Sequence, residues 1–393
     1  MHKNIYLLSI VQMLAMAGPP MVTMLGGIVG GQLAPSPKLD TLPLACMMLG
    51  IGLFSVPAAL TMKRIGRKAG FVSASLVAVL ASLGAANAIR MESFVIFCLS
   101  LLMLGGNVAF VQQFRFAAAE SVPPKLVGTA ISWVVAGGII ASYLGPELGK
   151  RFKDEAETPF MGAFLAMGGI YLLASLLLLF YRNVEPPTPP QGHDEPRPLK
   201  EILMQSKFLL SVAAGMTAFG TMVTIMMATP VSMHVYDGFS LEQVALIIQI
   251  HTVCMYLPSL FTGYMLLRLG MIKMMVLGLV ALALAVTCNV SGHNLLTYAV
   301  GLAFLGIGWN LLFISATSML TQCYRHAERF KVQAANDFLV YSVMGLGSLS
   351  AGPLLKTMGW EMTNLITLPL LILMLVGIFL HLGKERRLAL VGE

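Results

Sequence analysis

Apolar residues occur in long continuous blocks along this chain. They do not follow the periodic apolar and polar pattern of amphipathic helices or strands. Each block is about 20 residues long, enough for a helix to cross a hydrocarbon layer of about 30 Å. Twelve such runs can be counted: 5–31, 41–62, 70–90, 93–117, 127–149, 160–181, 208–232, 243–267, 271–291, 295–322, 333–356 and 362–383. The pattern predicts an all-α membrane protein with twelve transmembrane helices in two six-helix halves.

The one long polar stretch, residues 182–207, divides the chain into these halves. Its core, residues 185–201, carries charges and six prolines, a composition typical of an extended, solvated linker. We therefore expect a first half over 1–181, a cytoplasmic proline-rich linker over 182–207 and a second half over 208–393. The first apolar run has no small-residue cleavage site after it, so we expect it to be retained.

Composition and charge agree with a membrane protein and set its orientation. The chain is 57% apolar and 11% charged, with a mean hydropathy of +0.81. If the N-terminus is cytoplasmic, only six of the 25 Lys and Arg residues lie outside: Lys38, Arg90, Lys150, Arg151, Lys153 and Lys356. Basic residues favour the cytoplasmic side, so both termini should be cytoplasmic. This asymmetry explains the net charge of +7, and we expect no nucleic-acid partner.

Neither the cysteines nor any short motif points to an enzyme. The five cysteines are odd in number and lie in or at the ends of apolar runs, so we expect no structural disulfides. No nucleophile–base set, phosphate loop or zinc spacing occurs. We therefore expect no catalytic residues and no cofactor.

The two halves resemble each other. Arg64-Ile65-Gly66 corresponds to Arg268-Leu269-Gly270, the Leu104–Asn107 segment to Leu305–Asn310, and Gly145-Pro146 to Gly352-Pro353. These matches keep the same order at offsets of 203 to 207 residues. Half-length duplication is typical of secondary transporters, which bind their substrate near the membrane midplane.

These features resemble the major facilitator superfamily across nearly the full chain. Its loop after the second helix has the form G-x-L-x-D-R-x-G-R-K, and this sequence keeps Arg64-Ile65-Gly66-Arg67-Lys68. Lys63 replaces the acidic residue and Ala59 the first glycine, so the usual charge pairing of this loop is altered. By resemblance, gating residues are Arg64, Gly66, Arg67 and Lys68, and the charges near the ends of the fourth and eleventh runs add Arg115 and Asp337.

Two pairs of potential metal ligands lie in consecutive apolar runs. Met222 and Met226 are four residues apart, as are His251 and Met255, so each pair shares one helix face. Thioether sulfur and imidazole nitrogen favour soft metals such as Cu(I). At 1.5 Å per residue, Met226 lies ~10 Å and His251 ~13 Å below the outer edge, while Met222 and Met255 lie ~16 and ~20 Å down. The four donors could therefore converge on one ion.

The order of these pairs resembles the CcoA-like branch of the superfamily, copper importers that supply cbb3-type cytochrome c oxidase assembly in bacteria. The resemblance implies that Met222, Met226, His251 and Met255 bind copper as the transported substrate, with Cys254, Met233 and His234 as possible auxiliary ligands. It also implies a monomeric, multi-pass protein of the bacterial inner membrane that works by alternating access. Protonation of His251 could release the ion, which would make protons a partner.

Other interpretations of the same residues remain open. Methionine is frequent, 28 residues in all, and commonly fills gaps in apolar cores. A membrane histidine can be structural, relay protons or anchor an organic substrate. The alternative function is a carrier of a small organic solute, either a flavin-like compound or a drug. Trp133, Tyr143 and Trp309 could stack on a flat solute of this kind, and Asn107 or Asn310 could line its path.

Overall fold

The structure is a computed structural model that describes residues 3–36, 39, 42–184 and 196–391. Its described residues form helices, turns and loops, with no β-strand among them. Helices satisfy their backbone hydrogen bonds within one segment, as a chain in lipid requires.

Ten helical segments of the described chain are long and apolar enough to cross a membrane. Two are far longer than one crossing needs: Leu42–Arg90 has 49 residues and His326–Glu385 has 60. Because about 20 residues span a bilayer, each can hold two of the predicted runs. The predicted multi-pass helical architecture is therefore confirmed, while the count of twelve stays a prediction.

Glycines mark the turns inside these two long segments. Gly66 interrupts the first with a φ of 82°, and Gly359 interrupts the second with a φ of 81°. Side chains strain this left-handed backbone, whereas glycine adopts it readily. Gly66 falls between the runs predicted at 41–62 and 70–90, and Gly359 falls between those at 333–356 and 362–383.

The chain divides into two compact units. Unit 1 comprises Met1–Pro123, Trp133–Thr188 and Gln333–Phe338, and unit 2 comprises the rest. The division at 182–207 stays a prediction, since short segments of α6 and α14 belong to the unit of the other half and residues 185–195 lie outside the described residues. The expectation of an extended linker up to Glu201 is wrong at its end, because the short helix α8 begins at Leu199.

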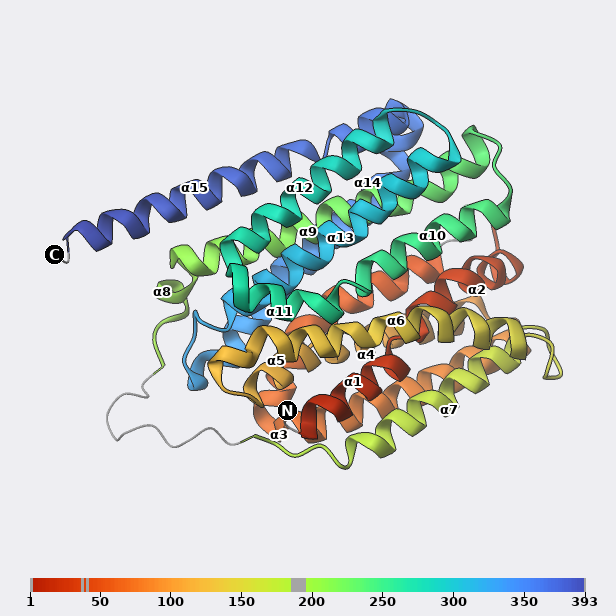
Figure 1. The fold of residues 1–393 in the computed structure, drawn as a ribbon. Helices are drawn as coiled ribbons and strands as arrows, with labels where there is room; N and C mark the ends of the chain where they lie inside the picture. The colour runs from red at the N-terminus through yellow and green to blue at the C-terminus, as the bar shows by residue number, and fades with distance from the viewer. Residues whose placement is uncertain (1–2, 37–38, 40–41, 185–195, 392–393) are drawn as a thin grey trace. The chain divides into compact units, whose positions relative to one another are not determined.

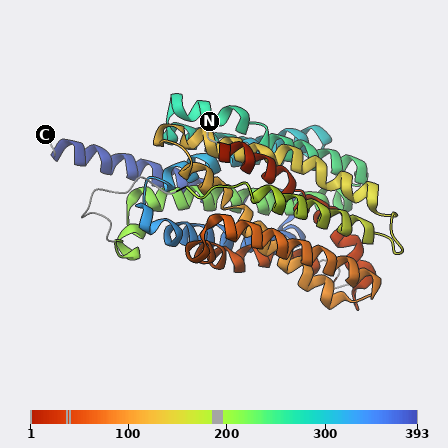
Figure 2. The same ribbon diagram turned by 90° about the horizontal axis from the view of Figure 1, so that it is seen from below.

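Unit 1 is a bundle in which α3 packs against α4 and α7 (Figures 1 and 2). Gly50 and Gly105 allow the close approach of α3 and α4, since a Cβ atom on Gly50 would lie 2.1 Å from the Leu102 carbonyl oxygen and one on Gly105 2.0 Å from that of Met47. The helices are α1 (Lys3–Ala15), α2 (Gly18–Leu33), α3 (Leu42–Arg90), α4 (Phe94–Val111), α5 (Phe114–Glu120), most of α6 (Val127–Phe152) and α7 (Met161–Leu178).

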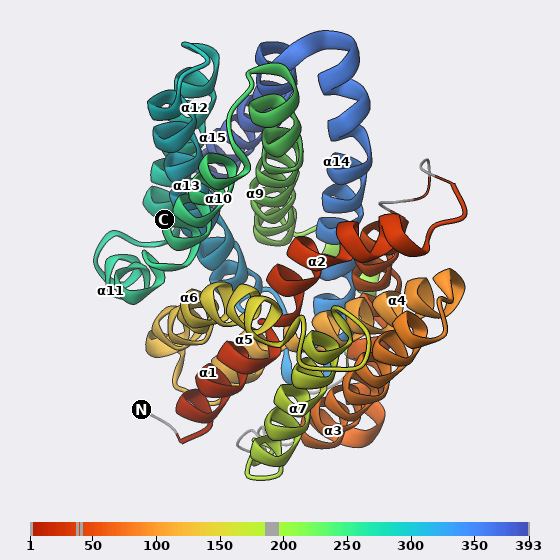
Figure 3. The same cartoon turned by 90° about the vertical axis from the view of Figure 1, so that its right-hand side faces the viewer.

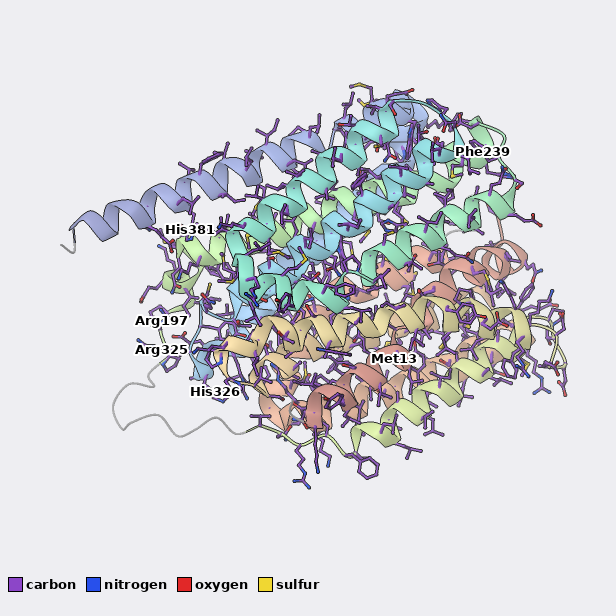
Figure 4. All side chains as sticks on the ribbon, viewed as in Figure 1. Met13, Arg197, Phe239, Arg325, His326 and His381 are labelled. Carbon is purple, nitrogen blue, oxygen red and sulfur yellow. The ribbon has the colours of Figure 1, made fainter. Side chains whose placement is uncertain are left out.

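Unit 2 is organised around α13, which packs against α9, α10 and α12 (Figures 1 and 3). The elements are η2 (Pro124–Leu126), α8 (Leu199–Leu203), α9 (Ser206–Val231), the π-helical turn η3 (Ser232–Tyr236), α10 (Leu241–Tyr256), α11 (Ser259–Leu269), α12 (Met271–Val290), α13 (Leu295–Leu320), η4 (His326–Glu328), most of α14 (Arg329–Leu365) and α15 (Leu368–Val391). Arg197 and Arg325 are labelled in Figure 4. Arg197 bonds the Glu328 carboxylate at 2.8 Å, and Glu328 also accepts from the Arg325 backbone N–H.

Candidate functional site

His251 on α10 is a buried imidazole with one nitrogen bonded and one unpaired. Its side chain is 1% exposed, and Nδ1 lies 2.9 Å from the Leu302 carbonyl oxygen. A carbonyl oxygen can only accept, so Nδ1 carries the hydrogen. In the neutral ring, Nε2 is therefore a lone-pair acceptor, and no described residue is its hydrogen-bond partner.

Gly306 on α13 makes the His251–Leu302 bond possible. A Cβ atom at this position would lie 2.7 Å from both the His251 carbonyl oxygen and the Met255 nitrogen. Only glycine therefore allows α13 to approach α10 this closely. The Leu-Gly motif noticed in the sequence thus acts in helix packing.

The predicted copper ligands are placed on two helices that contact each other. Met222 is buried on α9, and Met226 on α9 and Met255 on α10 are half-buried. Cys254 is also half-buried, and no group of three His, Cys, Asp or Glu side chains suitable for a metal occurs among the described residues. Convergence of the four predicted donors on one ion stays a prediction.

Two of the three predicted auxiliary ligands, Met233 and His234, lie in η3, where α9 ends, and the third, Cys254, lies on α10. Met233 is completely buried, whereas His234 is exposed with its Nδ1 2.8 Å from the Phe239 carbonyl oxygen. The packing role of Met233 is therefore clear, and an auxiliary metal role for either residue stays a prediction.

An aromatic cluster surrounds Trp309 in unit 2. The Trp309 and Phe313 rings stack with centroids 4.8 Å apart and an angle of 23°. Phe219 meets both rings edge-on at 5.4 and 5.3 Å, Tyr256 lies 6.0 Å from Trp309, and Tyr341 lies 5.6 Å from Phe219. The cluster joins α9, α10, α13 and α14, and the buried Trp309 Nε1–H has no hydrogen-bond acceptor among the residues described.

Asn310, next to Trp309, is fully bonded. Its Oδ1 accepts from the Thr262 hydroxyl at 2.7 Å, and its Nδ2 donates to the Met255 carbonyl at 2.8 Å and the Ser259 hydroxyl at 2.6 Å. These partners flank Pro258, which has no N–H to continue the helix and lies where α10 gives way to α11. Asn310 therefore stabilises this helix break.

Asn107 on α4 differs sharply from Asn310, its partner in the sequence repeat. It is 3% exposed, yet neither Nδ2 nor Oδ1 has a hydrogen-bond partner among the residues that the structure describes. Each unpaired buried polar group costs about 1–3 kcal/mol. The fold does not use this amide for its own stability.

Buried ion pairs connect α3 and α5 with the Gln333–Phe338 segment of α14 in unit 1. Arg67 makes two hydrogen bonds to Glu120, at 2.6 and 2.8 Å, and a third to Gln333 at 2.9 Å. Arg115 pairs with Asp337, which also accepts from Gln113 at 2.7 Å. Of the predicted gating residues, Arg67, Arg115 and Asp337 thus meet buried partners.

The other three predicted gating residues lie around the turn in α3. Arg64 is exposed, Gly66 provides the turn itself, and the Lys68 backbone N–H donates to Asn183 at 3.0 Å. A gating role for any of the six stays a prediction.

A third polar cluster lies in the loop between α12 and α13. His293 bridges Asp237, 3.0 Å from Nδ1, and Glu361, 2.7 Å from Nε2. Hydrogen bonds to Glu361 and Asp237 raise the pKa of His293. Tyr298 donates to Asp237 at 2.7 Å, so this cluster holds η3, the loop and α14 together.

Sequence reasoning named Trp309 but missed the rings around it. Phe313 could have been found, because it follows Trp309 by one helical turn. Phe219 and Tyr341 come from distant helices, and no local pattern links them to Trp309. Trp133 and Tyr143 on α6, the other aromatic candidates, are 43% and 72% exposed.

The sequence is similar to known membrane carriers over nearly its whole length. The profile of the Major Facilitator Superfamily matches residues 5–255 and 210–390. The riboflavin transporter RfnT of Brucella anthropi is 40% identical over 386 residues, covering 98% of this chain and 97% of that protein.

Two solved structures show a similar fold at low sequence identity. The human organic anion transporter has a TM-score of 0.77 and 14% identity, with 96% of this chain and 100% of that chain covered. A bacterial homologue of the iron transporter ferroportin has a TM-score of 0.74 and 13% identity, with 97% and 100% covered. One scaffold thus occurs in proteins named for organic and for metal cargo, and fold similarity does not select the substrate.

Proposed function

The chain belongs to the major facilitator superfamily, and we propose that it imports a flat heteroaromatic solute of the riboflavin type by alternating access. It is a multi-pass membrane transporter and not an enzyme. The observation that carries the proposal is the 40% identity, over nearly the full length of both chains, to a riboflavin transporter. This favours the organic solute over copper.

The Trp309 cluster supports this substrate class. Aromatic faces attract flat rings through offset or edge-on packing. The Trp309 ring, which stacks on Phe313, also carries a buried N–H without an acceptor among the described residues, and polar groups of this kind orient ligands in otherwise apolar sites. A solute with a flat ring system and ring acceptors fits both properties.

Uptake by a riboflavin-auxotrophic bacterium tests the proposal. Cells that express the chain should grow at riboflavin concentrations that do not support cells with an empty vector. Trp309→Ala should abolish this growth, whereas Trp133→Ala should retain it because the Trp133 ring is exposed. Expression of each variant is checked by immunoblot. Equal growth of wild type and empty vector would overturn the proposal.

Copper import is the second candidate, and one observation favours it. Metal-binding histidines commonly donate one ring N–H to a backbone carbonyl and bind the metal with the other nitrogen. The Leu302 bond and the unpaired Nε2 of His251 fit this arrangement. Copper uptake that is lost in His251→Ala and Met255→Ala, with riboflavin uptake absent, would select copper and the CcoA-like branch. Uptake independent of pH between about 5.5 and 7.5 would remove the proposed role of His251 protonation.

The cellular setting completes the proposal. We place the protein as a monomer in the bacterial inner membrane with both termini in the cytoplasm, because basic residues concentrate on that side. Reporter fusions at the two ends should both be active in the cytoplasm. An external reporter signal from either end would contradict this orientation.

A further inference from the structure

Asn107 is a buried amide in the middle of a membrane-spanning segment. The segment Phe94–Glu120 extends 13 residues to each side of it, or about 20 Å at 1.5 Å per residue. Polar groups at this depth are costly and usually functional. Within the described part of the chain, the side chain nevertheless lacks a partner for both its donor and its acceptor.

The local packing does not account for this residue. Gly105 faces α3, because a Cβ atom there would meet the Met47 carbonyl oxygen, and Gly106 lies against the Phe54 ring. Successive positions on a helix are about 100° apart, so Asn107 is about 200° from Gly105, on the side of α4 opposite the Met47 contact. Gln12, on the neighbouring helix α1, also has a buried oxygen without a partner.

The chemistry of a free carboxamide indicates what it can bind. An N–H donor and a C=O acceptor lie side by side, so the group can pair with a ring edge that presents C=O beside N–H. Carboxamides of Asn and Gln recognise adenine through an equivalent pair of bonds. The isoalloxazine ring of riboflavin has such an edge, an imide with N–H between two carbonyls.

We propose that Asn107 is a specificity-determining residue that binds the imide edge of the transported heterocycle. Nδ2–H donates to a ring carbonyl, and the ring N–H donates to Oδ1. This assignment rests on the proposed function, since it names the part of a flavin-like solute that the transporter reads. Asn310 cannot take this role, because its amide is fully used by Thr262, Met255 and Ser259.

Binding of riboflavin and 3-methylriboflavin to the purified full-length chain tests the assignment. The methyl group replaces the imide hydrogen, and binding is followed by the change in flavin fluorescence. Wild type should prefer riboflavin by about 10- to 100-fold, because the methyl group removes the ring N–H donor and leaves the buried Oδ1 without a partner. Asn107→Leu should lose riboflavin affinity by a similar factor and should no longer distinguish the two flavins.

Control variants separate recognition from folding. Trp133→Phe should retain the wild-type preference. Asn310→Ala should lower the thermal unfolding temperature, whereas Asn107→Leu should leave it unchanged or raise it. A lower unfolding temperature in Asn107→Leu, or an unchanged preference for riboflavin, would overturn the assignment.

The outcomes also distinguish this inference from the proposed function. Riboflavin binding with an unaffected Asn107→Leu variant contradicts only the role of Asn107. If riboflavin does not bind, the proposed function fails, and lumichrome, which has the imide edge without the ribityl chain, serves as the probe. Lumichrome binding that requires Asn107 would support the imide assignment, and absence of lumichrome binding would overturn it.

Discussion

Asn107 in unit 1 and Asn310 in unit 2 occupy corresponding positions of the sequence repeat but have opposite surroundings. Asn310 bonds with Thr262, Met255 and Ser259 across the break at Pro258. The amide of Asn107 has no hydrogen-bond partner in the described ranges of the chain. The difference shows that one repeat position can serve fold stability in one half and remain available for a ligand in the other.

Unit 1 pairs its buried charges while leaving this amide unpaired. Arg115 and Asp337 are 3% and 1% exposed and bind each other. Arg67 likewise bonds Glu120 and Gln333, so these buried charges have partners, whereas the amide of Asn107 has none among the described residues.

The largest effect is expected from breaking the Arg115–Asp337 pair. Arg115→Ala leaves the Asp337 charge buried without its cation and should lower the free energy of unfolding by about 3–5 kcal/mol. Thermal unfolding in detergent measures this change. The double variant with Asp337→Asn should recover most of the loss, and equal losses in the single and double variants would contradict the pairing.

Removal of the Asn310 network should have the next largest effect. Asn310→Ala removes three hydrogen bonds and leaves the Met255 carbonyl and Ser259 hydroxyl without this donor, at a cost of about 2–4 kcal/mol. The unfolding temperature should fall. An unfolding temperature equal to that of wild type would show that Asn310 does not stabilise the Pro258 break.

The comparison predicts the opposite sign at Asn107. Asn107→Leu removes a donor and an acceptor that have no partners, so stability should be unchanged or higher by up to about 2 kcal/mol. The same unfolding measurement, made beside Asn310→Ala, gives the sign directly. Similar losses of stability in Asn107→Leu and Asn310→Ala would contradict the predicted difference between the two repeat positions.

The smallest effect is expected at the exposed His293 cluster. Because Glu361 and Asp237 raise the pKa of His293, its charged form is favoured in the folded protein. This stabilisation is complete below the ordinary pKa of about 6.5 and is lost as the pH rises through the raised value. The unfolding temperature of wild type should decrease over that range, and His293→Gln should remove this component. An unchanged pH dependence in His293→Gln would contradict the assignment.

The membrane helices were predictable because apolar length is a local property of the chain. The runs at 41–62 and 70–90, for example, lie on either side of the turn at Gly66. The count of twelve stays a prediction, because helix continues on both sides of the glycine turns in Leu42–Arg90 and His326–Glu385. Each of these two segments holds two of the predicted runs. The helix break at Pro258 depends on hydrogen bonds from another helix, and the short helix α8 consists of a few residues after a proline. Both therefore gave only a weak signal in the sequence.

The candidate site shows the same limit. The sequence identified His251, Trp309, Asn107 and Asn310 as unusual polar or aromatic residues in apolar runs. It could not show that Asn310 is satisfied and Asn107 is not, because their partners come from other helices. The soft-ligand pairs drew attention to copper, but identical spacing arises from residues that pack on one helix face.

Uptake of labelled riboflavin by liposomes containing only the purified chain tests the central claim most directly. The account predicts saturable accumulation that excess unlabelled riboflavin abolishes and that Trp309→Ala eliminates. Absence of riboflavin uptake, together with copper uptake that requires His251, would contradict it.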